Sequence, residues 1–275
     1  MRFFSRARKK WKTLKHIVGG KAIQAASRAV RVNERPIFVL GNQKAGTTVI
    51  AALLAERIGA SVTLDFRTPS ASALQAVHAG KQSLTDFIED RAWYFSREIV
   101  KEPGLTFLYE ELALLFPRAP FAVVVRDPRD NIRSLLNRVG LSGCREQLSR
   151  RELDEVSPIW TNIIKGKELG DDGANYIEIL ATRWNRAAEV SLENERPCLI
   201  RYEDFVSNKE EEITRMAERL GCTPRHDISK KKDVQYQSQG NRDIAWDEFY
   251  SAENLARIEQ ICGKNMASLG YRLVQ

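Results

Sequence analysis

The stretch Pro36-Ile-Phe-Val-Leu-Gly-Asn-Gln-Lys-Ala-Gly-Thr-Thr48, followed by the apolar-periodic segment 49–58, decides the fold. Its apolar run predicts a buried strand over Ile37–Leu40. A glycine-bounded loop with one lysine follows, and two threonines open a predicted helix. Such a loop binds an anion, because its backbone N–H groups and those of the first helical turn point at the ligand. Lys44 adds a positive charge and the threonines add hydroxyl donors, so we predict a phosphate-binding loop.

The order of residues separates this loop from that of the nucleoside triphosphatases. Their loop reads G-x-x-x-x-G-K-[ST], with the lysine after the second glycine and a neighbouring hydroxyl for magnesium. Here Lys44 comes before Gly46, and no hydroxyl follows a Gly-Lys pair. We therefore expect no metal-bound triphosphate here. A P-loop kinase or other nucleotide phosphotransferase remains the alternative interpretation.

Further apolar runs bounded by turn signals alternate with helical patterns along the chain. The predicted strands after the first are Ser61–Leu64, Glu98–Val100, Phe121–Val125 and Cys198–Ile200. Alternating strands and helices predict a three-layer α/β/α fold with a central parallel sheet. The loops at the carboxyl ends of its strands should share one rim, where ligands bind. Residues 141–177 are polar and contain several glycines, which is typical either of an excursion over the site or of a surface insertion.

The positive charge is concentrated at the N-terminus. Residues 1–33 carry ten Lys or Arg and no acidic residue, and the rest of the chain carries 33 basic and 36 acidic residues. Aromatic and aliphatic residues lie among the charges of this arm, as in an amphipathic helix on an anionic membrane surface. A solvated helix packed on the domain and a disordered leader are the alternatives. We divide the chain into this arm and one domain over residues 34–275, and expect no nucleic-acid partner, because no basic stripe continues into the domain.

Cysteine and histidine usage predicts neither disulfides nor a zinc site. The four cysteines are scattered without metal-ligand spacing, and the three histidines form no cluster. No apolar stretch approaches the roughly 20 residues of a membrane span, and no secretory signal is present. We therefore expect a cytoplasmic protein, with the arm as a contact to the inner face of a membrane.

A second motif, Phe121-Ala-Val-Val-Val-Arg-Asp-Pro-Arg-Asp-Asn-Ile-Arg-Ser-Leu136, follows the same logic as the first. A buried strand ends at Arg126, Pro128 shapes the turn, and a helix begins near Asp130. Arg126 and Ser134 can converge on one anion at the strand–helix junction. An ion pair of Arg126 with a neighbouring aspartate is the alternative for this motif taken alone.

Together the two motifs resemble the nucleotide-binding elements of the sulfotransferases that use 3′-phosphoadenosine 5′-phosphosulfate (PAPS) and release adenosine 3′,5′-bisphosphate (PAP). The resemblance covers roughly residues 36–275. It implies that the Lys44 loop binds the 5′-phosphosulfate and that Arg126 and Ser134 bind the 3′-phosphate. Tyr202, in Arg201-Tyr-Glu-Asp-Phe205, matches a tyrosine near the adenine, and Asn241 and Arg242 match a closing loop. The donor-binding residues implied are Gly41, Asn42, Gln43, Lys44, Ala45, Gly46, Thr47, Thr48, Arg126, Ser134, Tyr202, Asn241 and Arg242.

The resemblance also implies the chemistry, an in-line displacement at sulfur that needs no metal. Lys44 would neutralise the bridging oxygen and the leaving phosphate. Lys101 matches a strand-end lysine near the transferred group, but Pro103 fills the position where small-molecule members have a histidine base. Asp65 is our first candidate for the base, Glu102 the second and His78 the third. For Asp65, a helix-cap or turn aspartate is the competing interpretation.

The acceptor is less defined than the donor. Val49 follows the two threonines, where many cytosolic small-molecule members have an aromatic residue, and this favours a carbohydrate-type or bacterial member. We expect an enzyme of the EC 2.8.2 type that sulfates a hydroxyl, or an amine, of a glycan or glycolipid. The competing classes are the kinase and a non-enzymatic module that binds an anionic membrane or nucleic acid through the arm.

Overall fold

The computed structural model describes residues 30–66, 68–167, 169, 175–236 and 244–273. A five-stranded, fully parallel sheet forms its centre, in the order β2-β3-β1-β4-β5. The strands are β1 (Ile37–Gly41), β2 (Val62–Leu64), β3 (Ile99–Lys101), β4 (Phe121–Val125) and β5 (Cys198–Arg201). All five were predicted within a few residues, and the predicted α/β/α class with a parallel sheet is confirmed.

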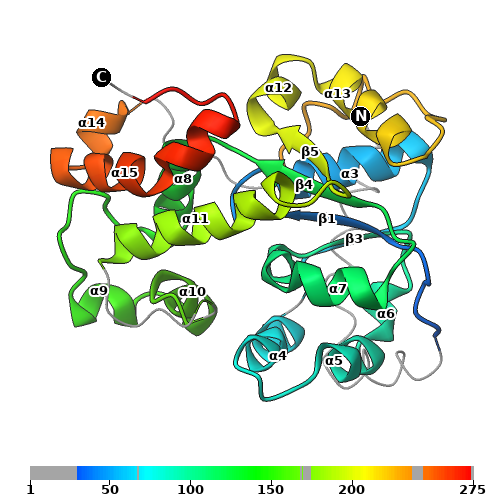
Figure 1. Cartoon of the computed structure of the whole chain (residues 1–275), viewed down its shortest axis with the longest axis horizontal. Helices are drawn as coiled ribbons and strands as arrows, with labels where there is room; N and C mark the ends of the chain where they lie inside the picture. Colours follow the sequence, from blue (N-terminus) through cyan, green and yellow to red (C-terminus); the bar gives the residue numbers. More distant parts are fainter. Residues whose placement is uncertain (1–29, 67, 168, 170–174, 237–243, 274–275) are drawn as a thin grey trace, which may run out of the picture.

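Helices cover both faces of the sheet. Those from the phosphate loop to β4 are α3 (Thr47–Ile58), α4 (Thr68–His78), α5 (Leu84–Asp90), α6 (Ala92–Phe95), the 3-10 helix η1 (Pro103–Leu108) and α7 (Tyr109–Leu115). Those after β4 are α8 (Pro128–Val139), α9 (Arg150–Asp154), α10 (Pro158–Ile164), α11 (Tyr176–Leu192), α12 (Tyr202–Ser207), α13 (Lys209–Arg219), α14 (Trp246–Phe249) and α15 (Ala252–Ser268). Figure 1 shows α3, α12 and α13 on one side of the sheet and α7 on the other.

The pleat of the strands divides the core in two. Ile37 and Val39 of β1 pack with α3 and α13 in one cluster, whereas Phe38 and Leu40 pack with η1, α7, α8, α11 and α15 in the other. Side chains of a strand alternate between faces, so a strand buried on both sides is apolar throughout. This explains why the strands appear in the sequence as continuous apolar runs.

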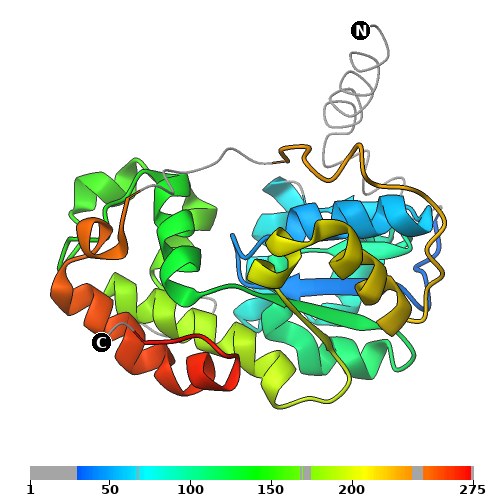
Figure 2. The same cartoon turned by 90° about the horizontal axis from the view of Figure 1, so that it is seen from above.

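The parallel pairing brings the carboxyl ends of all five strands to one edge, as predicted. Figure 2 shows this edge facing the group of helices α8, α14 and α15. The segment at residues 141–177 contributes α9 and α10, which Figure 1 shows on the opposite side of α11 from α14 and α15. Within the described residues, no helix has both the length and the apolar character that a membrane crossing requires. Almost all of the arm predicted at residues 1–33 lies outside the described residues.

Candidate functional site: two adjoining anion sites

The loop between β1 and α3 has the curled backbone of an anion site. Lys44 has φ 68° and Gly46, the N-cap of α3, has φ 100°, so the left-handed region recurs within three residues. Alternation of left- and right-handed residues makes the backbone N–H groups line a concavity that suits phosphate. The first turn of α3, which begins at Thr47, adds N–H groups that have no partner within the helix, and the positive end of a helix dipole.

Two glycines of the loop are required by close neighbours. A Cβ on Gly41 would lie 2.4 Å from the carbonyl oxygen of Val124 on β4, so only glycine lets these strands end side by side. A Cβ on Gly46 would lie 2.3 Å and 2.5 Å from ring carbons of Tyr202. The tyrosine ring therefore packs directly on the phosphate loop, which places Tyr202 at the predicted site.

The side chains of Asn42 and Gln43 face the protein interior. Asn42 Nδ2 donates to Asn131 Oδ1 at 2.8 Å, and Asn131 Nδ2 donates to the Gln43 carbonyl oxygen at 2.9 Å. Arg183 of α11, which is fully buried, donates from Nη2 to Gln43 Oε1 at 2.6 Å and from Nε to Asn42 Oδ1 at 3.1 Å. These side chains thus shape the loop from below.

Sequence reasoning missed Asn131 and Arg183. Arg183 could have been found from the apolar pattern of α11, because it is a charged residue at a helix position whose neighbours along the same face are buried. The next residue, Trp184, donates from Nε1 to the Arg126 carbonyl oxygen at 2.8 Å. Successive residues of one helix therefore support the two anion motifs.

A buried lysine joins the phosphate loop to the predicted base. Lys101, at the end of β3, has only 2% of its side chain exposed, and its Nζ donates to Thr48 Oγ1 at 2.9 Å. The same Nζ forms an ion pair with Asp65. Asp65 follows β2 in a left-handed conformation with φ 62°, and 45% of its side chain is exposed. Both candidates therefore lie beside the start of α3, with the aspartate open to solvent.

Glu102 lies next to this pair but faces inward. Its Oε2 accepts a hydrogen bond from Phe66 N at 2.8 Å, and its Oε1 accepts one from Gly104 N at 3.2 Å. Burial, followed by the charge of Asp65, raises the pKa of Glu102 to about 7, against the opposing effect of Lys101. His78, the third candidate, stacks edge-on against Phe107 at a centroid distance of 6.4 Å.

The second anion motif adjoins the first. Arg126 is 7% exposed and donates from Nη1 to the Lys44 carbonyl oxygen at 3.4 Å. Its guanidinium lies 4.9 Å from the centre of the Tyr202 ring, and its contact with Asp130 is a loose 3.8 Å. The Arg126 Nε is buried and has no hydrogen-bond partner among the described residues. Because burying an unpaired donor on a cation is costly, this atom is suited to an acceptor that a ligand supplies.

The other residues predicted to bind the 3′-phosphate end of the donor are Ser134 on α8 and, in the closing loop, Asn241 and Arg242. Ser134 is half-buried on α8, which begins at Pro128, two residues earlier than predicted. The Asp127 side chain caps this helix by accepting from Arg129 N at 2.9 Å, which explains the Asp-Pro pair in the motif. Asn241 and Arg242 lie outside the described residues, so their role stays a prediction.

Arg129 of the same motif is structural. It is 2% exposed and forms ion pairs with Asp127 at 2.6 Å and Glu259 at 2.7 Å. It also donates to the carbonyl oxygen of Arg272 at 2.8 Å and lies over the ring of Trp246 at 3.9 Å. This arginine fastens α15 and the C-terminal segment to the start of α8.

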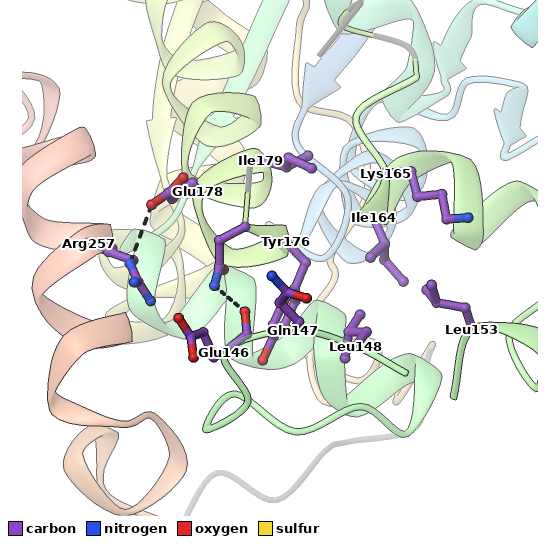
Figure 3. Close-up of a pocket in the computed structure, with 11 residues that line it drawn as sticks. Glu146, Gln147, Leu148, Leu153, Ile164, Lys165, Tyr176, Glu178, Ile179 and Arg257 are labelled. Atoms are coloured by element: carbon purple, nitrogen blue, oxygen red, sulfur yellow. Dashed lines mark hydrogen bonds and ion pairs between the residues drawn. The ribbon is translucent and has the colours of Figure 1, made fainter. Parts of the chain in front are cut away.

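A separate cavity of about 360 Å³ lies at the N-terminal end of α11 (Figure 3). Its lining residues are Glu146, Gln147, Leu148, Leu153, Ile164, Lys165, Asn175, Tyr176, Glu178, Ile179 and Arg257. Tyr176 donates to the Ser142 carbonyl oxygen at 2.7 Å, and Arg257 pairs with Glu178 at 3.3 Å. Tyr176, Arg257 and Glu178 of this lining are thus held by protein partners.

The fold and the site define an α/β protein in which the predicted phosphate loop and the Arg126 motif lie next to each other. The model of the Sulfotransferase family matches residues 60–227, which is more than half of the chain. The chain therefore belongs to the sulfotransferase family. The matched stretch includes Asp65, Lys101 and Arg126, whereas the phosphate loop precedes it.

Solved structures of sulfotransferases share the fold. A sulfotransferase from Alicyclobacillus acidocaldarius is 16% identical, with a TM-score of 0.50 over 88% of this chain and 98% of that one. Sulfotransferase STF9 from Mycobacterium avium is 15% identical, with a TM-score of 0.51 over 90% of this chain and 79% of that one. No curated protein matches the sequence. Within the described residues, no group of three or more His, Cys, Asp or Glu side chains is placed to hold a metal ion.

Proposed function

We propose that this protein transfers the sulfuryl group of PAPS to a hydroxyl of an acceptor and releases PAP. The observation that carries the proposal is the contact of Arg126 with the backbone of Lys44, which joins two anion sites. A nucleotide with anionic groups at both its 5′ and 3′ positions matches this pair. The unpartnered Nε of Arg126 and membership of the sulfotransferase family support the same donor.

In this mechanism the acceptor oxygen attacks sulfur in line with the bond to the 5′-phosphate. The new sulfur–oxygen bond forms as the bond to the bridging oxygen breaks, and the leaving group is PAP. Lys44 neutralises charge on the bridging oxygen and the leaving phosphate, while Lys101 holds Thr48 at the start of α3. The acceptor proton passes to Asp65, whose carboxylate is the exposed one of the two at this edge.

The acceptor is proposed to be a glycan or glycolipid hydroxyl, with an amine as the alternative nucleophile. Val49 leaves no aromatic side chain at the start of α3, as expected from a carbohydrate-type member. The basic arm, outside the described residues, would bring the enzyme to an anionic membrane that carries a lipid-linked acceptor. We place the protein at the cytoplasmic face on this ground.

Donor binding is tested with PAP and with adenosine 5′-phosphate, which lacks the 3′-phosphate. Arg126→Ala should weaken PAP binding in calorimetry by about 10- to 100-fold, because a charged hydrogen bond contributes about 1.5–3 kcal/mol. The affinity for adenosine 5′-phosphate should change little. Arg118→Ala is the matched control, since Arg118 is 73% exposed and pairs only loosely with Glu34 at 3.3 Å. Equal losses for the two nucleotides would refute the 3′-phosphate assignment.

Activity is tested by transfer from sulfur-labelled PAPS to a panel of glycans and lipid extracts. Label on a glycan or glycolipid supports the proposed acceptor class. Magnesium-dependent binding of ATP, with no binding of PAP, would replace the proposal with a kinase. Labelled transfer confined to small phenols or sterols would retain the donor and reject the acceptor class.

A further inference from the structure

The turn after β2 holds Asp65, the base of the proposed function on which the following inference rests, in an unusual backbone conformation. Asp65 has φ 62°, a left-handed conformation that is unfavourable for a residue with a side chain. Such a conformation persists only when its surroundings determine it. The structure must therefore supply contacts that keep the carboxylate of Asp65 at the edge of the site.

Contacts from β3 determine this turn on both sides of Asp65. The Asp65 N–H donates to the Lys101 carbonyl oxygen at 3.0 Å, and the next N–H, that of Phe66, donates to Glu102 Oε2 at 2.8 Å. The Phe66 ring is buried, with the Tyr94 ring 4.8 Å away between centroids. The backbone after Asp65 is thus fixed by a buried ring and by one carboxylate oxygen.

Both oxygens of Glu102 are committed to the backbone. While Oε2 accepts from Phe66, Oε1 accepts from Gly104 N at 3.2 Å, which caps η1. The residue is 8% exposed, whereas 45% of the Asp65 side chain is exposed. A carboxylate that serves two backbone donors and is closed to solvent is poorly placed to take a proton from an acceptor.

We infer that Glu102 is a positioning residue, which holds the left-handed turn at Asp65 and joins it to η1, and that it is not the proton acceptor. Its side chain acts through its length and its accepting oxygens. The carboxylate of Asp65 is needed to accept the proton, whereas the carboxylate of Glu102 is not needed for proton transfer. Of the two carboxylates at this edge, Glu102 therefore positions the turn and Asp65 accepts the proton.

Two conservative substitutions separate these roles, because they remove opposite properties. Glu102→Gln keeps the side-chain length and one accepting oxygen but removes the carboxylate. Glu102→Asp keeps the carboxylate but shortens the side chain by one CH₂, so that it cannot reach both backbone donors. A positioning role predicts that Gln preserves kcat better than Asp, and a base predicts the reverse order.

Turnover is measured with PAPS and the acceptor that the panel identifies. Glu102→Asp should lower kcat by about 100-fold, because misplacement by about 1 Å has effects of this size, and Glu102→Gln by less than about tenfold. Asp65→Asn, the reference for loss of the base, should lower kcat by about 100-fold or more. The affinity for PAP should stay within about threefold of wild type in all three. A Gln variant as inactive as Asp65→Asn, or an Asp variant as active as wild type, would overturn the inference.

Hydrogen exchange of the Phe66 amide gives a measure that needs no acceptor. Exchange should be about tenfold faster in Glu102→Asp than in Glu102→Gln, since one hydrogen bond contributes roughly a factor of ten. Equal exchange in the two variants would overturn the positioning role. Failure of the wild type to bind PAP or to transfer label would instead reject the proposed function, and the exchange result would still stand.

Discussion

Substitution of Gly46 by alanine should destabilise the protein and the phosphate loop through two separate effects. The backbone at Gly46 has φ 100°, which we expect to cost alanine about 1–2 kcal/mol. The new Cβ would also lie 2.3 Å from a ring carbon of Tyr202, and overpacking of this kind costs about 1–3 kcal/mol. The expected loss in the free energy of unfolding is therefore about 2–5 kcal/mol.

Two further variants separate these effects in urea unfolding. Gly140→Ala is the matched control, because Gly140 has φ 72° and a Cβ there would have no neighbour within 4 Å. It should lose only the backbone share of about 1–2 kcal/mol. Adding Tyr202→Ala to Gly46→Ala should recover the share that arises from the clash. If Gly46→Ala and Gly140→Ala are equally destabilised, the close approach of Tyr202 to the loop is wrong.

Three other outcomes are expected. Glu102→Gln should flatten the pH dependence of urea unfolding between about pH 4.5 and 7. In the wild type, the pKa of Glu102 is raised from 4.5 to about 7 in the folded state, so the folded protein binds more protons than the unfolded chain in this range. The wild type should therefore lose up to about 3 kcal/mol as the pH rises through this range, and equal slopes would contradict the shift. Arg129→Met should lower stability in urea by about 3–5 kcal/mol, since it leaves Asp127 buried without its partner, and added Asp127→Asn should restore part of the loss. Thr106→Val should lower stability by about 1–3 kcal/mol in thermal unfolding, because Gly41 N–H loses the hydroxyl that accepts from it at 2.8 Å, and an unchanged midpoint would argue against that bond.

The sheet could be predicted because its strands are buried on both faces. Each strand then appears as a short apolar run, and the alternation with helices leaves a parallel sheet as the simplest arrangement. The phosphate loop and the Arg126 motif could be located for a related reason. Each lies directly between a strand and a helix, so all of its parts are close in sequence.

Contacts between distant segments could not be predicted in this way. Arg183 reaches Gln43 across 140 residues, and a lone arginine in a helix pattern is usually a solvated side chain. The role that we infer for Glu102 depends on the hydrogen bond to Phe66 across neighbouring strands, which no local pattern contains. Sequence reasoning placed Glu102 among the candidate bases by its residue type and its position at the end of a predicted strand.

The two successive residues of α11 that support the anion sites have a mechanical consequence. Arg183 contacts the loop after β1, and Trp184 contacts the backbone of Arg126 after β4. Because both contacts come from adjacent residues of one helix, a single element sets the distance between the loop after β1 and the backbone of Arg126. A substitution that shifts α11 is therefore expected to move the two motifs together.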